Sequence, residues 1–275
     1  MNPVPVPLPP QGGEGTRRAI LGAVVAVIVT AAGLWAAQGS SRRWDAERAA
    51  TCMPDSCFCE ADRGGAIRQP ANTWSCLGFV AVGCLIFLLP RRHSANPFVA
   101  ETVYARTYGS IVAALGWGSM WFHGTLTFRG EWADAMSMHL LPSFLIVHNL
   151  RRGGALKPGG FLPAFCALAA LNGLYLAAST VFRKQTFGLL LGALIVTELW
   201  ARRRAAFSGE PGLFNAAFGL FAAAFAIWIL DFTRAVCAPA SWLQGHAAWH
   251  LLCAAAAGVL FAYYRCARLE PATGI

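Results

Sequence analysis

The strongest constraint in this sequence is a series of apolar runs that each have membrane-spanning length. Eight runs alternate with polar segments, at about residues 19–38, 72–90, 107–126, 132–150, 160–181, 185–200, 212–232 and 244–264. A helix of roughly 20 apolar residues crosses the hydrocarbon core of a bilayer, which is about 30 Å thick. The pattern predicts an all-α fold: a polytopic transmembrane helical bundle, with one N-terminal helix followed by a core of seven.

The composition supports lipid as the main solvent of this chain. Of its residues 56% are hydrophobic and only 13% are charged, whereas roughly a quarter of the residues of a soluble domain are charged. The formal charge of +9 is spread in small clusters between the apolar runs, and a nucleic-acid-binding protein would gather it on one face. The sequence also lacks a Gly-x-Ser-x-Gly elbow, a phosphate-binding loop and a dinucleotide fingerprint, which argues against serine-hydrolase and nucleotide chemistry.

The runs divide the chain into five parts. We expect a disordered tail over 1–18, an extra N-terminal transmembrane helix or signal anchor over 19–38, and an extracytoplasmic loop over 39–71. The helical core follows over 72–265, and a C-terminal tail over 266–275. The run at 19–38 is long for the apolar part of a cleaved signal peptide, which favours a retained helix.

The arginines and lysines predict the orientation of the helices. If the N-terminus lies inside, 13 of these cations fall on inner segments and nine on outer segments, five of the nine in the single long loop. Short cytoplasmic loops of membrane proteins carry the excess of positive charge. Both termini are therefore expected in the cytoplasm.

This orientation brings three histidines to the same outer membrane depth. His123 lies near the outer end of its run, and His246 and His250 open the last run at the same side. His246 and His250 are four residues apart, so on a helix they point the same way. Three histidines that leave a fourth tetrahedral position for water are typical of catalytic zinc, which lowers the pKa of that water.

Two further polar residues suit hydrolytic chemistry at such a site. Asp134 opens the next run and could act as general base on the zinc-bound water. Ser119 lies four residues before His123 and could orient that water or hydrogen-bond the oxyanion of a tetrahedral intermediate. Taken singly, Ser119 could instead be a helix-packing serine and Asp134 a helix cap.

The remaining polar residues of the runs have simpler interpretations. We interpret His139 as a core residue or a neighbour of the metal ligands. Asp231 is expected to pair with Arg234, or to support a zinc-bound histidine. Glu198 is expected to pair with Arg202 at the cytoplasmic interface.

Four cysteines lie in polar loops on the predicted outer side. Cys52, Cys57 and Cys59 cluster in the long loop, and Cys237 lies in a later one. These four could form disulfides, because disulfides persist in oxidising compartments.

The ordered motifs of this chain resemble those of the alkaline ceramidase family, over about residues 57–265. That family belongs to a superfamily of seven-helix membrane hydrolases that also includes the adiponectin-type receptors. The matching motifs are Cys59-Glu60, Asn72-Thr-Trp-Ser75, Ser119-Met-Trp-Phe-His123, Asp134, Trp228-Ile-Leu-Asp231, Cys237 and His246-Ala-Ala-Trp-His250.

The resemblance implies a zinc-dependent membrane amidase that hydrolyses the N-acyl bond of ceramide, or of a related N-acyl lipid, to a sphingoid base and a fatty acid. It implies that His123, His246 and His250 bind zinc. Asp134 would act on the water, and Ser119 would be the polar group beside the zinc. It also implies a disulfide between Cys59 and Cys237.

One part of the family pattern is altered here. Eukaryotic members carry a calcium site before the first conserved helix, built on an acidic stretch and a later glutamate. In this chain the stretch reads Cys57-Phe-Cys-Glu60-Ala-Asp62, the loop after it is shorter, and Gln69 stands near the later acid. Glu60 and Asp62 remain as candidate oxygen ligands for a second cation such as calcium, but the altered pattern argues against that site.

Two other functions stay open on sequence grounds. A non-enzymatic lipid receptor or sensor could use the same zinc to hold the bundle together, and two histidines could instead ligate a haem. The expected partner is a membrane lipid, with no nucleic acid and no evident protein partner. The alanine- and arginine-rich composition looks bacterial, so we expect a bacterial cytoplasmic membrane protein with its zinc site towards the outer face.

Overall fold

The computed structural model describes residues 13–40, 44–53, 55, 57–90, 96–179, 183–204, 207–208 and 210–269. Residues 1–12 of the predicted N-terminal tail lie outside this part of the chain. Helix α1 begins at Gly13, so residues 13–18, which we expected in the tail, are helical.

The described residues form a helical protein, as predicted, and the helices coincide with the apolar runs. The helices are α1 (Gly13–Gln38), α2 (Pro70–Ser75), α3 (Leu77–Leu88), α4 (Pro97–Ala100), α5 (Thr102–Thr125), α6 (Phe128–Arg152), the 3-10 helix η1 (Pro158–Gly160), α7 (Phe161–Ala178), α8 (Arg183–Arg204), α9 (Pro211–Phe232) and α10 (Gly245–Cys266). Two-residue strands β1 (Phe207–Ser208) and β2 (Arg268–Leu269) pair antiparallel. Strand β2 lies in the predicted C-terminal tail.

The distribution of apolar side chains is that of a membrane protein. Within the described residues, five helical segments are long and apolar enough to cross a membrane: α1, α2 with α3, α7, α9 and α10. Large apolar side chains such as Leu171, Leu189 and Phe218 are exposed on the outside of the bundle. Helix α6 turns polar side chains inward instead, and Ser143 and Asn149 are fully buried.

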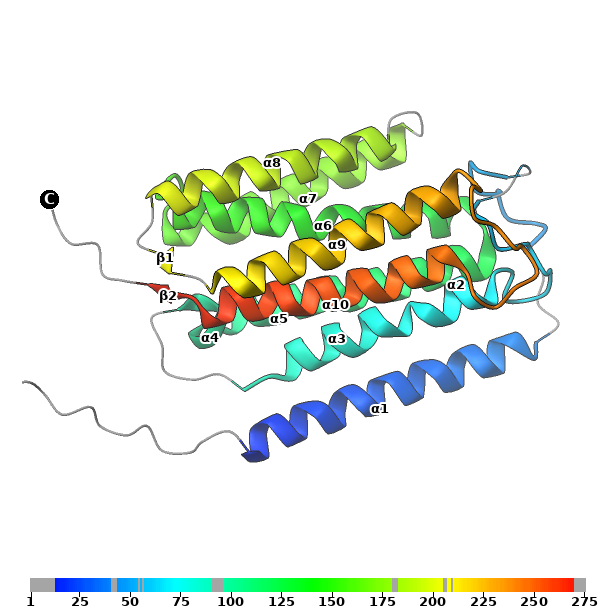
Figure 1. Cartoon of the computed structure of the whole chain (residues 1–275), viewed down its shortest axis with the longest axis horizontal. Coiled ribbons are helices and arrows are strands. Elements are labelled where there is room, and N and C mark those ends of the chain that lie inside the picture. Colours follow the sequence, from blue (N-terminus) through cyan, green and yellow to red (C-terminus); the bar gives the residue numbers. More distant parts are fainter. Residues whose placement is uncertain are drawn as a thin grey trace, which may run out of the picture.

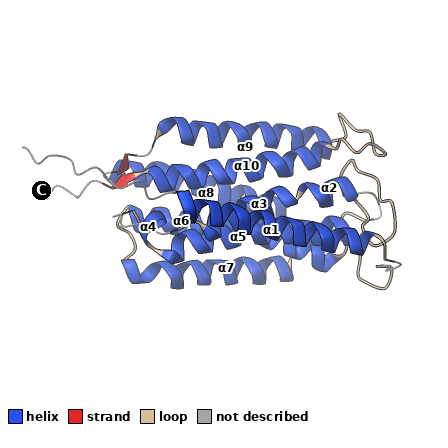
Figure 2. Cartoon of the chain, turned by 90° about the horizontal axis from the view of Figure 1, so that it is seen from below, coloured by secondary structure: helices blue, strands red, loops and turns tan. Residues whose placement is uncertain are grey.

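The long helices lie side by side along one direction (Figures 1 and 2). The loops before α2 and after α9 meet at one end of the bundle, which also carries both disulfides. We call it the disulfide end. The β1–β2 pair lies at the opposite end, and α1 flanks the bundle beside α3 (Figure 1).

Glycines allow α3 and α5 to approach closely, which brings the start of α2 against the end of α5. A Cβ atom on Gly83 would lie 2.3 Å from the backbone nitrogen of Ala113, and one on Gly109 would lie 2.6 Å from that of Phe87. Small residues at such contacts let membrane helices pack backbone to backbone. The closeness of α3 and α5 therefore depends on these two glycines.

Replacing Gly109 by valine is expected to separate these helices. The added side chain would meet backbone atoms that cannot move aside, and overpacking of this kind costs about 1–3 kcal/mol. The melting temperature of the purified protein in detergent should fall. Gly192→Val is the matched control, because a Cβ atom there meets nothing within 4 Å. Equal melting temperatures for the two variants would contradict this account.

Candidate metal centre

Three buried histidines converge at the disulfide end of the bundle. His123 lies in the last turn of α5, and His246 and His250 lie in the first turns of α10. One ring nitrogen from each of the three histidines lies within 4.8 Å of the other two. The sequence prediction that these three residues meet is correct.

The end of α5 is fixed by the segment that leads into α2. Leu126 adopts a left-handed conformation with φ 49° and ends α5. The amide of Arg68 donates to the carbonyl of Gly124 (2.9 Å), and the amide of Gln69 donates to the carbonyl of His123 (3.0 Å). The last carbonyls of a helix lack partners within it, so this segment satisfies them and holds His123 in place.

The start of α10 is fixed by a carboxylate from α9. Asp231 is buried, and its Oδ2 accepts a hydrogen bond from the backbone amide of His246 (3.0 Å). Its Oδ1 accepts from the amide of Cys59 (3.0 Å). Asp231 therefore caps α10 and ties it to the loop before α2.

Gln69 determines which nitrogen of His123 is free. The Nδ1 of His123 lies 2.8 Å from Oε1 of Gln69, and Nε2 of Gln69 donates to the carbonyl of Glu60 (2.8 Å). The second bond fixes the orientation of the amide, so its oxygen must face the histidine. An oxygen acceptor requires a proton on Nδ1, which leaves the lone pair of His123 on Nε2.

His250 is oriented in the same way from α2. Its Nδ1 lies 3.1 Å from the carbonyl oxygen of Asn72 and 2.8 Å from Oγ of Ser75. The carbonyl can only accept, so Nδ1 carries the proton and Nε2 carries the lone pair. The ring of Phe58 stacks on His246 with 3.6 Å between ring centroids.

The donor atoms fit a metal ion. Within the described residues, Nε2 of His123 and Nδ1 of His246 are buried and have no hydrogen-bond partner. A buried polar atom without a partner costs free energy, and a metal ion would supply the missing interaction. Three neutral imidazoles, two of them oriented by hydrogen bonds to their other nitrogen, are a donor set that suits zinc.

Ser119 and Asp134 form a hydrogen-bonded pair beside this cluster. The hydroxyl of Ser119, one turn before His123 on α5, donates to Oδ1 of Asp134 on α6. The Sγ atom of Cys76 lies 3.4 Å from Nδ1 of His250. Asp134 does not cap α6, because Thr127 does so by accepting from the amide of Gly130. The helix-cap interpretation of Asp134 is therefore wrong.

The two acids considered for a second cation already have partners in the protein. The carboxylate oxygens of Glu60 accept from the amides of Ala71 and Asn72, both at 2.8 Å. Asp62 forms an ion pair with Arg68 and accepts from the amide of Gly64 (2.9 Å).

The protein environment shifts the pKa values of these two acids in opposite directions. Burial raises the pKa of the Glu60 carboxyl above its ordinary value, although the amides of Asn72 and Ala71 oppose the rise. Burial also acts to raise the pKa of Asp62, but hydrogen bonds from Arg68 and Gly64 outweigh it and hold that pKa below its ordinary value. Because both carboxylates already have partners within the protein, they do not form a ligand set that fits calcium.

The other polar residues considered, His139 and Glu198, are not members of the histidine cluster. His139 lies outside the cluster, with Nδ1 2.7 Å from the carbonyl of Ala135 and Nε2 3.3 Å from the Thr186 hydroxyl. Glu198 pairs with Arg202, as expected, and is buried with a second ion pair to Arg152. It belongs to the core at the opposite end of the bundle.

Some residues that contact the histidines are not predicted from the sequence. Gln69 stands out there only as a departure from the family pattern, and Asn72 only as part of a motif. No sequence pattern points to Phe58. For Asp231 the sequence offers a pair with Arg234 or support of a clustered histidine, and its carboxylate accepts from the amides of Cys59 and His246, which agrees with the second alternative. The signal available was that Gln69, Asn72 and Asp231 are polar residues beside or within apolar runs, where each needs a partner.

Two disulfides close the loops of this end. Cys52 bonds to Cys57, and Cys59 bonds to Cys237. The second disulfide was expected from the family resemblance and is confirmed. It joins the loop that carries Glu60 to the segment just after α9, next to Asp231.

Comparison with protein families gives one match. The family model described as Ceramidase matches residues 58–273. The matched region includes Ser119, His123, Asp134, His246 and His250. A comparison with curated proteins finds no match.

Loss of one clustered histidine should abolish metal binding. Purified wild type is expected to hold about one zinc ion per chain, the usual content of a three-histidine site, measured by inductively coupled plasma mass spectrometry. His246→Ala should hold little zinc. His139→Ala is the matched control and should keep the wild-type content, because His139 is also a mostly buried histidine but lies outside the cluster. Equal zinc loss in both variants would point to unfolding instead.

Gln69 should affect zinc affinity without contacting the metal. Gln69→Met keeps the length of the side chain but removes the acceptor that fixes the proton on His123 Nδ1. Loss of such a partner lowers metal affinity about 10–100-fold, which competition with a fluorescent zinc chelator would measure. Gln185→Met, at an exposed position of α8, should leave the affinity unchanged. A wild-type affinity in Gln69→Met would disprove this role.

Proposed function

The chain belongs to the ceramidase family, and from this membership we propose that it is an integral-membrane amidase of sphingolipid metabolism. Its substrate would be ceramide or a related N-acyl lipid, and its products a sphingoid base or amine and a free fatty acid. The observation that carries this proposal is the buried cluster of His123, His246 and His250 beside the Ser119–Asp134 pair.

His123, His246 and His250 would hold a zinc ion, each through one ring nitrogen. When bound, zinc supplies a Lewis acid that polarises a carbonyl and makes water a nucleophile at neutral pH. Gln69 and Asn72 keep the protons of His123 and His250 on Nδ1, which directs the lone pairs of both rings to the metal.

Asp134 would move the proton during hydrolysis. The water oxygen bonds to the acyl carbon, the C–N bond breaks, and a proton passes from water to the leaving amine nitrogen. Asp134 can accept that proton at a carboxylate oxygen and return it to the amine as general base and then general acid. Ser119 donates to Oδ1 of Asp134, so it would hold the carboxylate in one orientation.

The same features favour an enzyme over a receptor. A structural zinc tends to have four protein ligands and no adjacent base. Here the described residues supply three clustered histidines, and the neighbouring carboxylate is not one of that group. A lipid receptor would have no need for Asp134 next to the site.

The location of the cluster suits a lipid substrate. The histidines lie at the ends of helices whose outer surfaces are apolar, so an N-acyl lipid could enter sideways from the bilayer. The disulfides at this end favour an oxidising compartment. We therefore propose that the site faces the outer side of the cytoplasmic membrane of a bacterium and that both termini lie in the cytoplasm.

Fatty-acid release tests the proposed function. Purified protein would be incubated with ceramide and other N-acyl lipids, and the products followed by mass spectrometry. Asp134→Asn should lower kcat by about 10²–10⁴-fold, the usual contribution of general acid–base catalysis, while keeping its zinc. Glu101→Gln, an exposed carboxylate at the opposite end, should retain wild-type activity. If zinc-loaded wild type released no fatty acid from any N-acyl lipid, the receptor would become the better hypothesis.

A further inference from the structure

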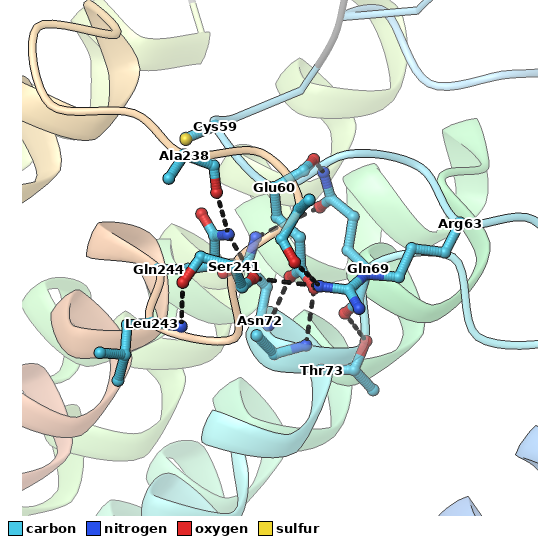
Figure 3. A network of polar contacts seen from close by, with 12 residues as sticks. Cys59, Glu60, Arg63, Gln69, Asn72, Thr73, Ala238, Ser241, Leu243 and Gln244 are labelled. Atoms are coloured by element: carbon cyan, nitrogen blue, oxygen red, sulfur yellow. Dashed lines mark hydrogen bonds and ion pairs between the residues drawn. The ribbon is translucent and has the colours of Figure 1, made fainter.

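Arg63 bridges the two loops that meet at the disulfide end (Figure 3). Its Nη2 atom donates to the carbonyl oxygens of Ser241 (3.0 Å) and Ala240 (3.3 Å). The same atom lies 3.7 Å from Oε1 of Glu60. Its guanidinium also lies over the ring of Trp242, 4.7 Å from the ring centroid. One cationic side chain thus binds a carboxylate and two carbonyls from a distant part of the chain.

Glu60, the acid in this contact, is buried and needs a counter-charge. Its side chain is inaccessible to solvent, whereas that of Arg63 is 29% exposed. A buried carboxylate is costly unless it is both hydrogen-bonded and paired with a cation. The amides of Ala71 and Asn72 supply the hydrogen bonds, and Arg63 supplies the positive charge.

Glu60 is linked to two of the clustered histidines, in each case through one intervening residue. Its carbonyl oxygen accepts from Gln69, which contacts His123. Its carboxylate accepts from the amide of Asn72, whose carbonyl contacts His250. A shift of Glu60 would therefore disturb both rings.

The charges and oxygens around Glu60 are accounted for without a metal ion. Arg63 and Arg68 face the carboxylates of Glu60 and Asp62, and the neighbouring carboxylate of Asp231 accepts from the amides of Cys59 and His246. Calcium requires six to eight oxygen ligands, with carboxylates among them. Both carboxylate oxygens of Glu60 accept from backbone amides, and the nearby carbonyls of Ala240 and Ser241 accept from Arg63. An added divalent cation would be repelled by both guanidinium groups.

We propose that Arg63 is the cation of this loop cluster, and that it positions the histidines through Glu60 without calcium. Arg63 is a positioning residue, because it acts through Glu60 and touches neither the metal ligands nor a substrate. The inference rests on the proposed metal centre and not on the identity of the lipid substrate.

The first experiment tests calcium on the wild-type protein. Zinc affinity and melting temperature would be measured with excess calcium chloride and in buffer freed of calcium on a chelating resin before zinc is added, at the same free zinc concentration. Both quantities should be equal in the two conditions. A rise in either with calcium would overturn the proposal.

The second experiment tests Arg63 by its charge. Arg63→Gln should raise the zinc dissociation constant by about 10–100-fold, the range for residues that support metal ligands. It should also shift the visible absorption bands of the cobalt-substituted protein, which report on the geometry of the three histidines. Arg63→Lys should recover part of the affinity. The matched control is Arg129→Gln, whose exposed side chain lies 3.7 Å from Glu47 in the same region. Wild-type affinity and spectrum in Arg63→Gln would overturn the proposal.

A third variant separates the charge from simple packing. Arg63→Met keeps most of the length of the side chain but removes its charge, so it should bind zinc more weakly than Arg63→Lys, which keeps the charge. If Arg63 only filled space, Arg63→Met would bind zinc at least as tightly as Arg63→Lys, and that result would overturn the proposal. The calcium experiment uses the wild-type protein, so it tests the proposal even if Arg63→Gln fails to fold. All these readouts are independent of lipid hydrolysis, so a failure of the proposed function would be seen separately.

Discussion

The candidate metal centre depends on one constraint: three histidine rings must be buried together, each with a nitrogen lone pair free to face the others. Neutral imidazole can carry its proton on either nitrogen, and only the ring with the correct free lone pair can bind a metal. In this protein the choice is made for His123 by a side-chain amide and for His250 by a backbone carbonyl. Both acceptors belong to the short segment that leads into and begins α2. The position of that segment therefore decides whether the histidines can act together.

The helices and the meeting of the histidines could be predicted from sequence because both follow from local patterns. Apolar runs set the helix positions, the spacing of His246 and His250 places both on one face, and alternating crossings bring His123 to the same end. The contacts of Gln69 and Asp231 follow from no such pattern. They depend on how two loops fold over the helix ends, and the disulfide between Cys59 and Cys237 joins residues 178 positions apart in sequence. Polar residues in loops have many candidate partners, and sequence spacing does not choose among them.

Two assignments based on spacing failed for identifiable reasons. Asp231 and Arg234 are three residues apart, which would make them neighbours on a continuous helix. Helix α9 ends at Phe232, and Arg234 has a left-handed backbone with φ 58°, so the helical spacing no longer applies and the Asp231 carboxylate turns to α10. Asp134 was considered as a cap because it stands near the start of an apolar run. The helix begins earlier, at Phe128, which moves Asp134 into its second turn and against Ser119.

The source of the positive charge beside Glu60 determines whether the orientation of His123 and His250 depends on the calcium concentration outside the membrane. A bound ion stabilises a fold only to the extent that its concentration exceeds its dissociation constant, so a loop held by calcium would respond to the calcium outside the membrane. A guanidinium belongs to the chain and remains charged at every physiological pH. With Arg63 as counter-charge, Glu60 stays in place whatever the ionic composition of the medium. The orientation of His123 and His250 then becomes a fixed property of the fold, and zinc is left as the one ion on which the proposed chemistry depends.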